Sequence, residues 1–263
     1  MVNQCMRFLS LLIILAIGTS RGGCAEKPKL PERHVRFLAI GEMPPFRQEI
    51  REGVRYELEP PEGSIPPREV MLGFGGKGEQ AESVPLRLGQ ISSPLKAPAG
   101  GGPLLLRRPG EREDSEPWLR IIRPDSDDFL VLLWRASAKG TWTEAKSFIL
   151  PDGPLTAPAG SVRIVNLAPV EVRVVLGTEK LLLGAGKSFQ RLMAAEAELP
   201  FQILMNDASG TLRTLHSGDI LQNQGERSLV LIYRADGEAP RRPVKVTVQR
   251  EPAPVAPPVK EKK

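Results

Sequence analysis

Short hydrophobic runs separated by clusters of proline and glycine make up most of the chain. Runs of this kind, rich in Val, Ile and Leu, are typical of strands in an all-β domain. Between residues 187 and 199 one or two helical turns are an alternative, which Pro200 would end, and a strand followed by a connection is preferred. We expect further strands at residues 35–40, 54–58, 70–74, 84–88, 104–107, 118–122, 129–135, 146–150, 162–167, 171–176, 179–183, 201–206, 212–216, 228–233 and 244–249.

Two of the hydrophobic runs are nearly the same. Residues 130–136 read LVLLWRA and residues 229–235 read LVLIYRA, so that five of seven positions are identical. Similar openings precede them, VRFL at 35–38 and VRIV at 162–165. The chain is therefore predicted to contain a diverged tandem repeat. We place its copies at 34–152 and 161–249, with a linker rich in proline and glycine at 153–160.

The pattern within each run indicates how its strand is covered. Residues 162–167 alternate between two faces, whereas 130–133 and 229–232 are apolar throughout and predict central strands covered on both faces. A second copy of this length suggests a two-sheet immunoglobulin-like domain. We therefore expect an all-β protein of two tandem immunoglobulin-like β-sandwich modules, with a small barrel as the alternative. The first copy is longer, and we expect its extra residues in surface loops at 60–67 and 94–117.

The opening of the second copy carries a family resemblance. The strand VRIVN at 162–166, followed by Ala168 and Pro169, resembles bacterial secreted tandem β-sandwich repeat proteins of unassigned function. That resemblance implies a β-sandwich at the cell surface or in the periplasm. It carries no catalytic residues to this chain.

The N-terminal residues predict export. A polar start with one positive charge, an apolar run at 8–17 and small residues up to Ala25 form a secretory signal peptide over residues 1–25. A polar leader follows at 26–33, and a retained N-terminal anchor is the alternative. Cleavage after Ala25 is preferred. Lipidation of Cys24 is the other reading, although Arg21 stands where a lipoprotein signal has an apolar residue. We expect a periplasmic or cell-surface protein without a disulfide framework.

The charge is uneven along the chain. The formal net charge is +5, yet from Arg241 onward basic residues outnumber acidic ones seven to two. The body is close to neutral, which argues against nucleic-acid binding. The basic tail at 250–263 is rich in proline. It is predicted either to attach to anionic wall or membrane surfaces or to be a disordered, solubilising end.

The residue types that support catalysis or metal binding are sparse. His34 and His216 are the two histidines, and neither belongs to a metal-binding or nucleophile motif. The acidic run at 125–128 suggests a solvated turn, with Ca²⁺ binding as the alternative. The glycines at 73–78 indicate a hairpin turn rather than a phosphate loop. We expect neither a cofactor nor an enzyme, although a hydrolase with an unrecognised carboxylate pair stays open.

Aromatic residues give the remaining candidates. Trp134 and Tyr233 occupy equivalent strand positions and are expected in the core. Trp142, in a turn, and Trp118, at the end of the predicted insertion, are expected to be exposed, so that a sugar ring could stack on them. The leading hypothesis is a non-catalytic exported envelope protein, acting as a structural or protein-binding module. Its edge strands would contact other envelope proteins. A carbohydrate-binding module using Trp118 or Trp142 is the alternative.

Overall fold

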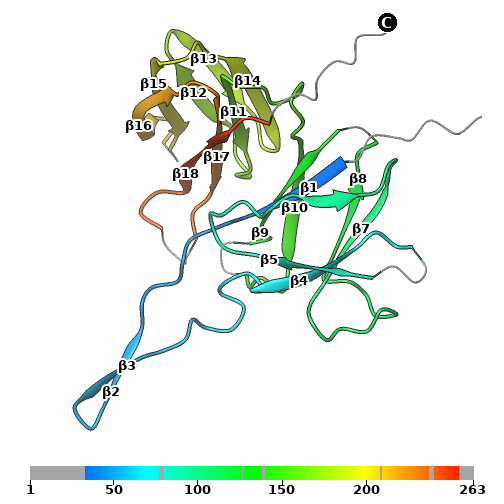
Figure 1. The fold of residues 1–263 in the computed structure, drawn as a ribbon. Coiled ribbons are helices and arrows are strands. Elements are labelled where there is room, and N and C mark those ends of the chain that lie inside the picture. The colour runs from blue at the N-terminus through cyan, green and yellow to red at the C-terminus, as the bar shows by residue number, and fades with distance from the viewer. Residues whose placement is uncertain are drawn as a thin grey trace, which may run out of the picture. The chain divides into compact units, whose positions relative to one another are not determined.

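The computed structural model describes residues 33–254, apart from 77–79, 126, 138–139, 208 and 237–239. The predicted signal peptide with Cys24, nearly all of the leader and the end of the tail lie outside these residues. Every regular element in the described part of the chain is a β-strand, which confirms the all-β prediction (Figure 1). Among the described residues there is no helix long and apolar enough to cross a membrane.

The first half of the chain (residues 33–151) contains two four-stranded sheets. Their strand orders are β10-β9-β1-β6 and β5-β4-β7-β8. In the first sheet β1 runs parallel to β9, and its other pairings are antiparallel. The strands are β1 (Arg33–Ile40), β4 (Glu69–Gly73), β5 (Glu82–Pro85), β6 (Leu95–Ala97), β7 (Gly102–Arg107), β8 (Leu119–Arg123), β9 (Phe129–Arg135) and β10 (Ala145–Pro151).

The second half of the chain (residues 161–252) contains two sheets of the same size. Their strand orders are β18-β17-β11-β14 and β13-β12-β15-β16. Here β11 runs parallel to β17, and the other pairings are antiparallel. The strands are β11 (Ser161–Asn166), β12 (Val172–Leu176), β13 (Glu179–Leu183), β14 (Lys187–Leu192), β15 (Ala197–Asn206), β16 (Leu212–Gln222), β17 (Glu226–Arg234) and β18 (Val244–Pro252).

The two halves share strand order and register. Each strand of the first half corresponds to one of the second in the same sheet position, with β1 equivalent to β11 and β9 to β17. In the parallel pairs Arg36 lies opposite Leu130, and Arg163 lies opposite Leu229. The repeated LVL segments therefore occupy equivalent strands, as the sequence predicts. The segment at 187–192 is a strand, as preferred over helical turns.

Each half has its own hydrophobic core between its two sheets. In the first half, Phe37 and Val131 of one sheet share a core with Leu72 and Leu104 of the other. In the second half, strands β11 and β17 share a core with β12 and β15 through Ile164, Val230, Val174 and Phe201. The alternating apolar positions of these strands face the core, which explains the two-sheet, sandwich-like construction.

A third hydrophobic cluster joins the halves. It combines the positions that alternate with the core positions, namely Leu38, Ile40, Leu130, Leu132 and Leu150 of the first half with Val165, Leu167, Leu231 and Tyr233 of the second. The outer faces of β1 and β9 are thus covered by those of β11 and β17. This explains why the repeated segments are apolar at every position rather than at alternate ones. The face of Arg163 and Val165 is likewise covered.

The structure shows where the extra residues of the first half lie, and it corrects one of the two positions expected for them. Residues 41–68 connect β1 to β4, whereas residues 167–171 suffice between β11 and β12. The longer connection contains the hairpin of β2 (Gln48–Arg51) and β3 (Val54–Glu57). The expectation that 94–117 is an insertion was wrong. Strands β6 and β7 lie there and correspond to β14 and β15, and within this span the extra residues lie in the loop 108–118, whose equivalent is 207–211.

Candidate functional site

Of the two candidate tryptophans, Trp142 belongs to the first core and Trp118 packs against it. Trp142 is 1% exposed, and its backbone N–H donates to the carbonyl of Gly63 at 2.7 Å. Trp118 is half-buried against the same core and donates its Nε1–H to the carbonyl of Trp142 at 2.8 Å. The expectation that Trp142 is exposed is therefore corrected, because its apolar ring fills the core near the loop 136–144. A sugar ring needs an exposed aromatic face, and Trp142 offers none.

The other aromatic expectations concern the repeated segments. Tyr233 is buried and belongs to the cluster that joins the halves, and Trp134 is half-buried against the same cluster. The arginines that follow them differ. Arg135 forms an ion pair with Asp236 at 2.6 Å between Nη2 and Oδ1, whereas Arg234 is exposed. Equivalent positions in the repeat therefore serve different contacts.

The two histidines lie far apart in sequence and in setting. The backbone N–H of His34 donates to Oδ1 of Asp128 at 2.7 Å, and its ring lies 3.4 Å from the same oxygen. His216 packs against Phe201 with ring centroids 5.6 Å apart. Burial, followed by the charge of Arg242, lowers the pKa of His216. Within the described residues, no group of three or more His, Cys, Asp or Glu side chains could hold a metal ion.

A cluster of four charged side chains joins the halves beside the third hydrophobic cluster. Arg36 of β1 contacts Asp152 and Glu251, with its closest nitrogen–oxygen distance 2.5 Å to each. Arg227 of β17 contacts the same two carboxylates at 2.9 and 2.8 Å. Arg163, at the position equivalent to Arg36, donates to the carbonyls of Pro151 and Thr156. We call Arg36, Asp152, Arg227 and Glu251 the charge cluster.

In the charge cluster the pKa values of the two acids are shifted in opposite directions. Burial, only partly offset by Arg36 and Arg227, raises the pKa of Asp152. Burial also acts on Glu251, but hydrogen bonds and charge from Arg36 and Arg227 outweigh it and lower its pKa. Burial would lower the pKa of Arg36, but Glu251 and Asp152 raise it. Both carboxylates thus lie between the same two arginines.

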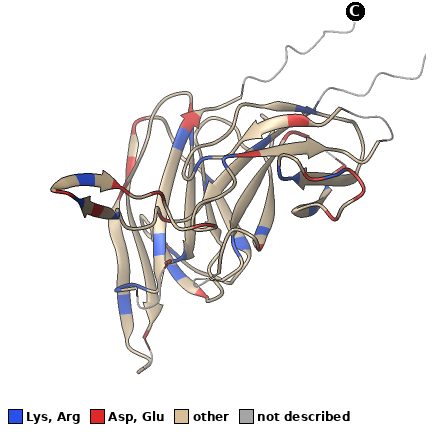
Figure 2. Ribbon diagram, turned by 90° about the horizontal axis from the view of Figure 1, so that it is seen from below, with Lys and Arg blue, Asp and Glu red and all other residues tan. Residues whose placement is uncertain are grey.

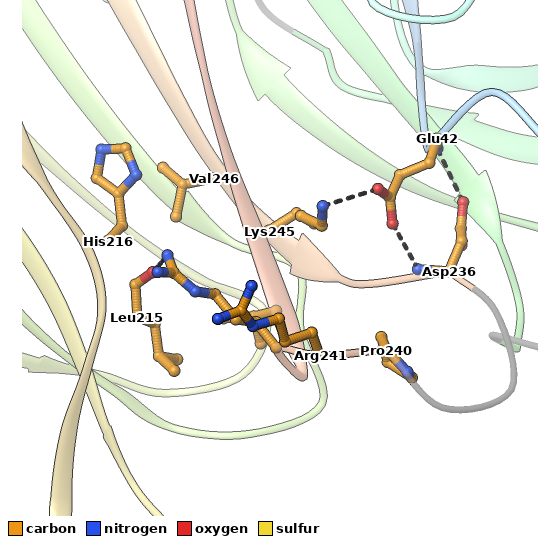
Figure 3. Close-up of a pocket in the computed structure, with 10 residues that line it drawn as sticks. Glu42, Leu215, His216, Asp236, Pro240, Arg241, Lys245 and Val246 are labelled. Carbon is orange, nitrogen blue, oxygen red and sulfur yellow. Dashed lines mark hydrogen bonds and ion pairs between the residues drawn. The ribbon is translucent and has the colours of Figure 1, made fainter.

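A pocket lies where β16 and β18 meet the connection after β1 (Figure 3). Its volume is about 500 Å³. The backbone N–H of Glu42 donates to the carboxylate of Asp236, with 2.8 Å between nitrogen and oxygen. The backbone N–H of Asp236 donates to the carboxylate of Glu42 in return, at 3.0 Å. Lys245 lies 2.9 Å from Glu42 and Arg135 lies 2.6 Å from Asp236, so both carboxylates have a cationic partner. Arg241 and His216 add positive or polar groups to the wall.

A second surface is the hairpin formed by β2 and β3, which extends away from the sheets (Figure 1). We call residues 43–58 the hairpin arm. Its two strands pair only with each other, and every residue of both is exposed. No residue of the arm belongs to any of the three hydrophobic clusters. The arm therefore contributes nothing to the cores of the chain that carries it.

The arm exposes an unusual number of large apolar side chains. Their exposed fractions are 66% for Met43, 69% for Phe46, 64% for Ile50, 54% for Val54 and 48% for Tyr56. Single exposed apolar residues are normal on a protein surface, whereas several on one projecting segment indicate a contact site. Figure 2 shows basic and acidic residues on the same two strands. The arrangement suits binding to another protein through both apolar and charged contacts.

The turn of the arm is built for a tight hairpin. Glu52 and Gly53 have φ values of 51° and 78°, the pair of positive angles that a two-residue hairpin turn requires. Arg51 contacts Glu49 at 2.7 Å and lies over the ring of Tyr56 at 5.9 Å. Sequence reasoning found the strand at 54–58 but missed β2. The Glu-Gly pair between IR and VRY was the signal that could have identified the hairpin.

Comparison with known proteins assigns no family to this chain. No protein-family model matches it, and no curated protein matches it. The resemblance of the second copy to secreted tandem β-sandwich repeat proteins therefore stays a prediction. Among the described residues, the hairpin arm is the segment on which five large exposed apolar side chains gather.

Proposed function

We propose that this chain is a non-catalytic exported envelope protein that acts as a structural or protein-binding module and contacts its partner through the hairpin arm. The observation that carries the proposal is the exposure of five large apolar side chains on an arm that packs against no core of its own chain. An isolated two-stranded hairpin is marginally stable in water. A partner that covers the arm would supply the packing that the hairpin lacks.

The body of the molecule is proposed to be two tandem immunoglobulin-like β-sandwich modules at 34–152 and 161–249, which hold the arm in place. The shared strand order and register of the halves support two modules. In each half the first strand (β1 or β11) lies inside a sheet and runs parallel to β9 or β17. The likeness to immunoglobulin domains is therefore limited to the construction from two packed sheets. Export through residues 1–25 is part of the same proposal.

The basic tail has a lesser part in this proposal. β18 extends to Pro252, and Glu251 belongs to the charge cluster, so the tail begins later than position 250. Attachment to an anionic surface would then depend on residues after 252, which include the last three lysines. A deletion that tests the tail should begin at 254, because removing Glu251 would also disturb the contact between the halves.

The proposal predicts that polar substitution in the arm abolishes partner contact without unfolding the protein. Val54→Ser combined with Tyr56→Ser should remove the chain's cross-linked and co-purified partners in envelope fractions, and leave the melting temperature unchanged, because neither side chain belongs to a core. The matched control is Leu182→Ser with Leu192→Ser, which changes two side chains 60% and 63% exposed on the second half. Identical partner profiles for the arm variant, the control and the unchanged chain would contradict the proposal.

A further inference from the structure

We propose that the partner of the hairpin arm is a second copy of this chain, with the two β3 strands paired antiparallel about a two-fold axis at Tyr56. This inference rests on the proposed function and names the partner that the arm contacts. It follows from three observations on β3: its alternating pattern, its unpaired backbone edge, and the order of its charges.

The first observation is an alternating pattern that this chain leaves uncovered. From Val54 to Leu58 the sequence reads VRYEL, so apolar Val54, Tyr56 and Leu58 share one face and charged Arg55 and Glu57 share the other. Such alternation is typical of a strand with one buried face. Here Val54 and Tyr56 are about half exposed, because no second layer of the chain packs on them. The pattern fits a covered state that one chain alone does not provide.

The second observation is the direction of the backbone groups. The N–H of Leu58 donates to the carbonyl of Arg47 at 2.9 Å, so this is a hydrogen-bonded pair of the hairpin. Such pairs alternate along an antiparallel ladder, so the backbone N–H and C=O groups of Tyr56 and Val54 also point to β2. The N–H and C=O groups of Arg55 and Glu57 therefore point to the open edge of β3. An edge of this kind accepts an added strand.

The third observation is that the charges of β3 are complementary to themselves when reversed. In this register Tyr56 lies opposite Tyr56 of the partner subunit. Arg55 then lies opposite Glu57 of the partner subunit, and Glu57 lies opposite Arg55 of the partner subunit. The hydrogen-bonding residues then face each other, as an antiparallel pair requires. Val54 meets Leu58 of the partner subunit, which completes an apolar row on the other face. Opposite charges and apolar pairs directly across strands are stabilising.

Other registers lose this match. A shift of two residues in one direction places Arg55 opposite itself, and in the other direction places Glu57 opposite itself, so that like charges meet. A shift of one residue sets hydrogen-bonding residues against non-bonding ones. The opposite edge, on β2, is less suited, because Glu49 and Arg51 already pair with each other and only Ile50 is apolar there. The pairing is isologous, as a two-fold interface must be.

A charge-exchange series on the full chain tests the register. Sedimentation velocity over a concentration range should show a dimer for the unchanged chain. Arg55→Glu and Glu57→Arg should each weaken it about tenfold, because two opposite-charge pairs become like-charge pairs. The double variant Arg55→Glu with Glu57→Arg should restore the dimer. An equimolar mixture of the two single variants should also restore it as a mixed dimer, since both cross-strand pairs become complementary again.

A cysteine variant tests the axis. In a chain with Cys5 and Cys24 replaced by Ser, Tyr56→Cys should form an intermolecular disulfide on mild oxidation, because residues opposite each other in a non-hydrogen-bonded pair have Cα atoms about 4.5 Å apart, within disulfide reach. The control Ile50→Cys, exposed on β2, should form none. Cross-linking through Ile50 alone would place the contact on β2 and overturn the proposed pairing.

The outcomes separate this inference from the proposed function. A chain that stays monomeric at all concentrations, while arm-dependent contacts persist in envelope fractions, overturns self-pairing and leaves the arm as a contact site for another protein. A dimer that is insensitive to every arm variant overturns self-pairing through β3. Loss of arm dependence in both experiments removes the proposed function as well.

Discussion

Arg36 and Arg163 show how one repeat position serves two purposes. Both lie on the face of their strand that meets the other half, opposite Leu130 and Leu229. Arg36 binds two carboxylates, whereas Arg163 donates to the backbone carbonyls of Pro151, at the end of β10, and Thr156, between the halves. Arginine suits both places because its planar group offers several donors in fixed directions. Each arginine thus places a charge at the margin of the apolar contact, where carboxylate or carbonyl oxygens accept its hydrogen bonds.

Tyr233 gives a prediction at the same scale. Burial, with the nearby charges of Glu42 and Asp236, raises its pKa to about 12. The chain has two tyrosines, so Tyr56→Phe leaves Tyr233 as the one phenol to follow. Its phenolate absorbance should appear near pH 12 rather than near the ordinary value of about 10. Folding retains this proton and unfolding releases it, so stability should decline as the pH rises from about 10 towards 12.

The measurement needs a check on folding. Circular dichroism in the same titration reports whether the sheets are intact at each pH. A phenolate transition near pH 10 in a chain with intact sheets would show that Tyr233 is solvated, and would contradict its placement between the halves.

At the scale of elements, the strands follow from local pattern and the arm does not. Residues 129–135 and 179–183 match β9 and β13, because runs of branched apolar residues between turn residues determine strands locally. The three-residue β6 carries no such signal and was missed, and the polar β14 was expected only as a strand somewhere within 187–199. β2 reads QEIR, and its strand form depends on the turn at Gly53 and on pairing with β3.

The candidate site shows the same limit. The expectation that Trp142 is exposed relied on its place after a turn, but the burial of a large ring is decided by the space between two sheets, which local sequence does not report. The arm was missed because exposure is also a property of the whole fold. Apolar residues such as Phe46 and Ile50 look like core residues until the core is seen to form without them.

The turn of the arm gives a prediction for one element. Gly53 has φ 78°, and a Cβ placed there would meet no atom within 4 Å, so substitution acts through backbone conformation alone. Gly53→Val should destabilise the hairpin by about 1–2 kcal/mol, because a branched side chain disfavours positive φ. We expect faster trypsin cleavage in the arm with an unchanged melting temperature.

Gly53→Asn is the matched control for this turn, since asparagine tolerates positive φ, and it should leave the cleavage rate near that of the unchanged chain. A drop in melting temperature for Gly53→Val comparable to that of a core substitution would show that the arm is integral to the body. It would then be unable to act as an independent contact element.

At the scale of the whole molecule, the halves are held together by an apolar contact with a charged margin. Leu38 and Leu132 of the first half meet Val165 and Leu231 of the second, and the charge cluster lies beside them. Gln249 of β18 adds a hydrogen bond to the carbonyl of Gly89 at 3.0 Å. Removing one partner of a buried ionic group leaves the others uncompensated, so this margin should be sensitive to substitution.

Glu251→Gln tests that margin. Loss of its ionic hydrogen bonds to Arg36 and Arg227 should lower the free energy of unfolding by about 2 kcal/mol near neutral pH. The pKa of Glu251 is lowered by folding, so its contribution is present above the ordinary carboxylate pKa and is lost as the pH falls through the folded value. The difference between the variant and the unchanged chain should therefore shrink in acid.

Urea unfolding near pH 7 and near pH 3 measures this difference. Glu171→Gln, which changes an exposed acid outside the cluster, is the control and should have little effect at either pH. A difference for Glu251→Gln that stays constant or grows in acid would show that its carboxylate does not bind the two arginines in the folded chain.

The apolar contact between the halves has a consequence for how the molecule responds to dilution. Because both faces belong to one chain, their effective concentration is fixed by the connecting segment and does not depend on how much protein is present. The cover over Leu132 and Leu231 therefore persists at any dilution. A contact made by the hairpin arm with a separate molecule has no such tether, so it is the arm whose occupancy rises and falls with the abundance of its partner.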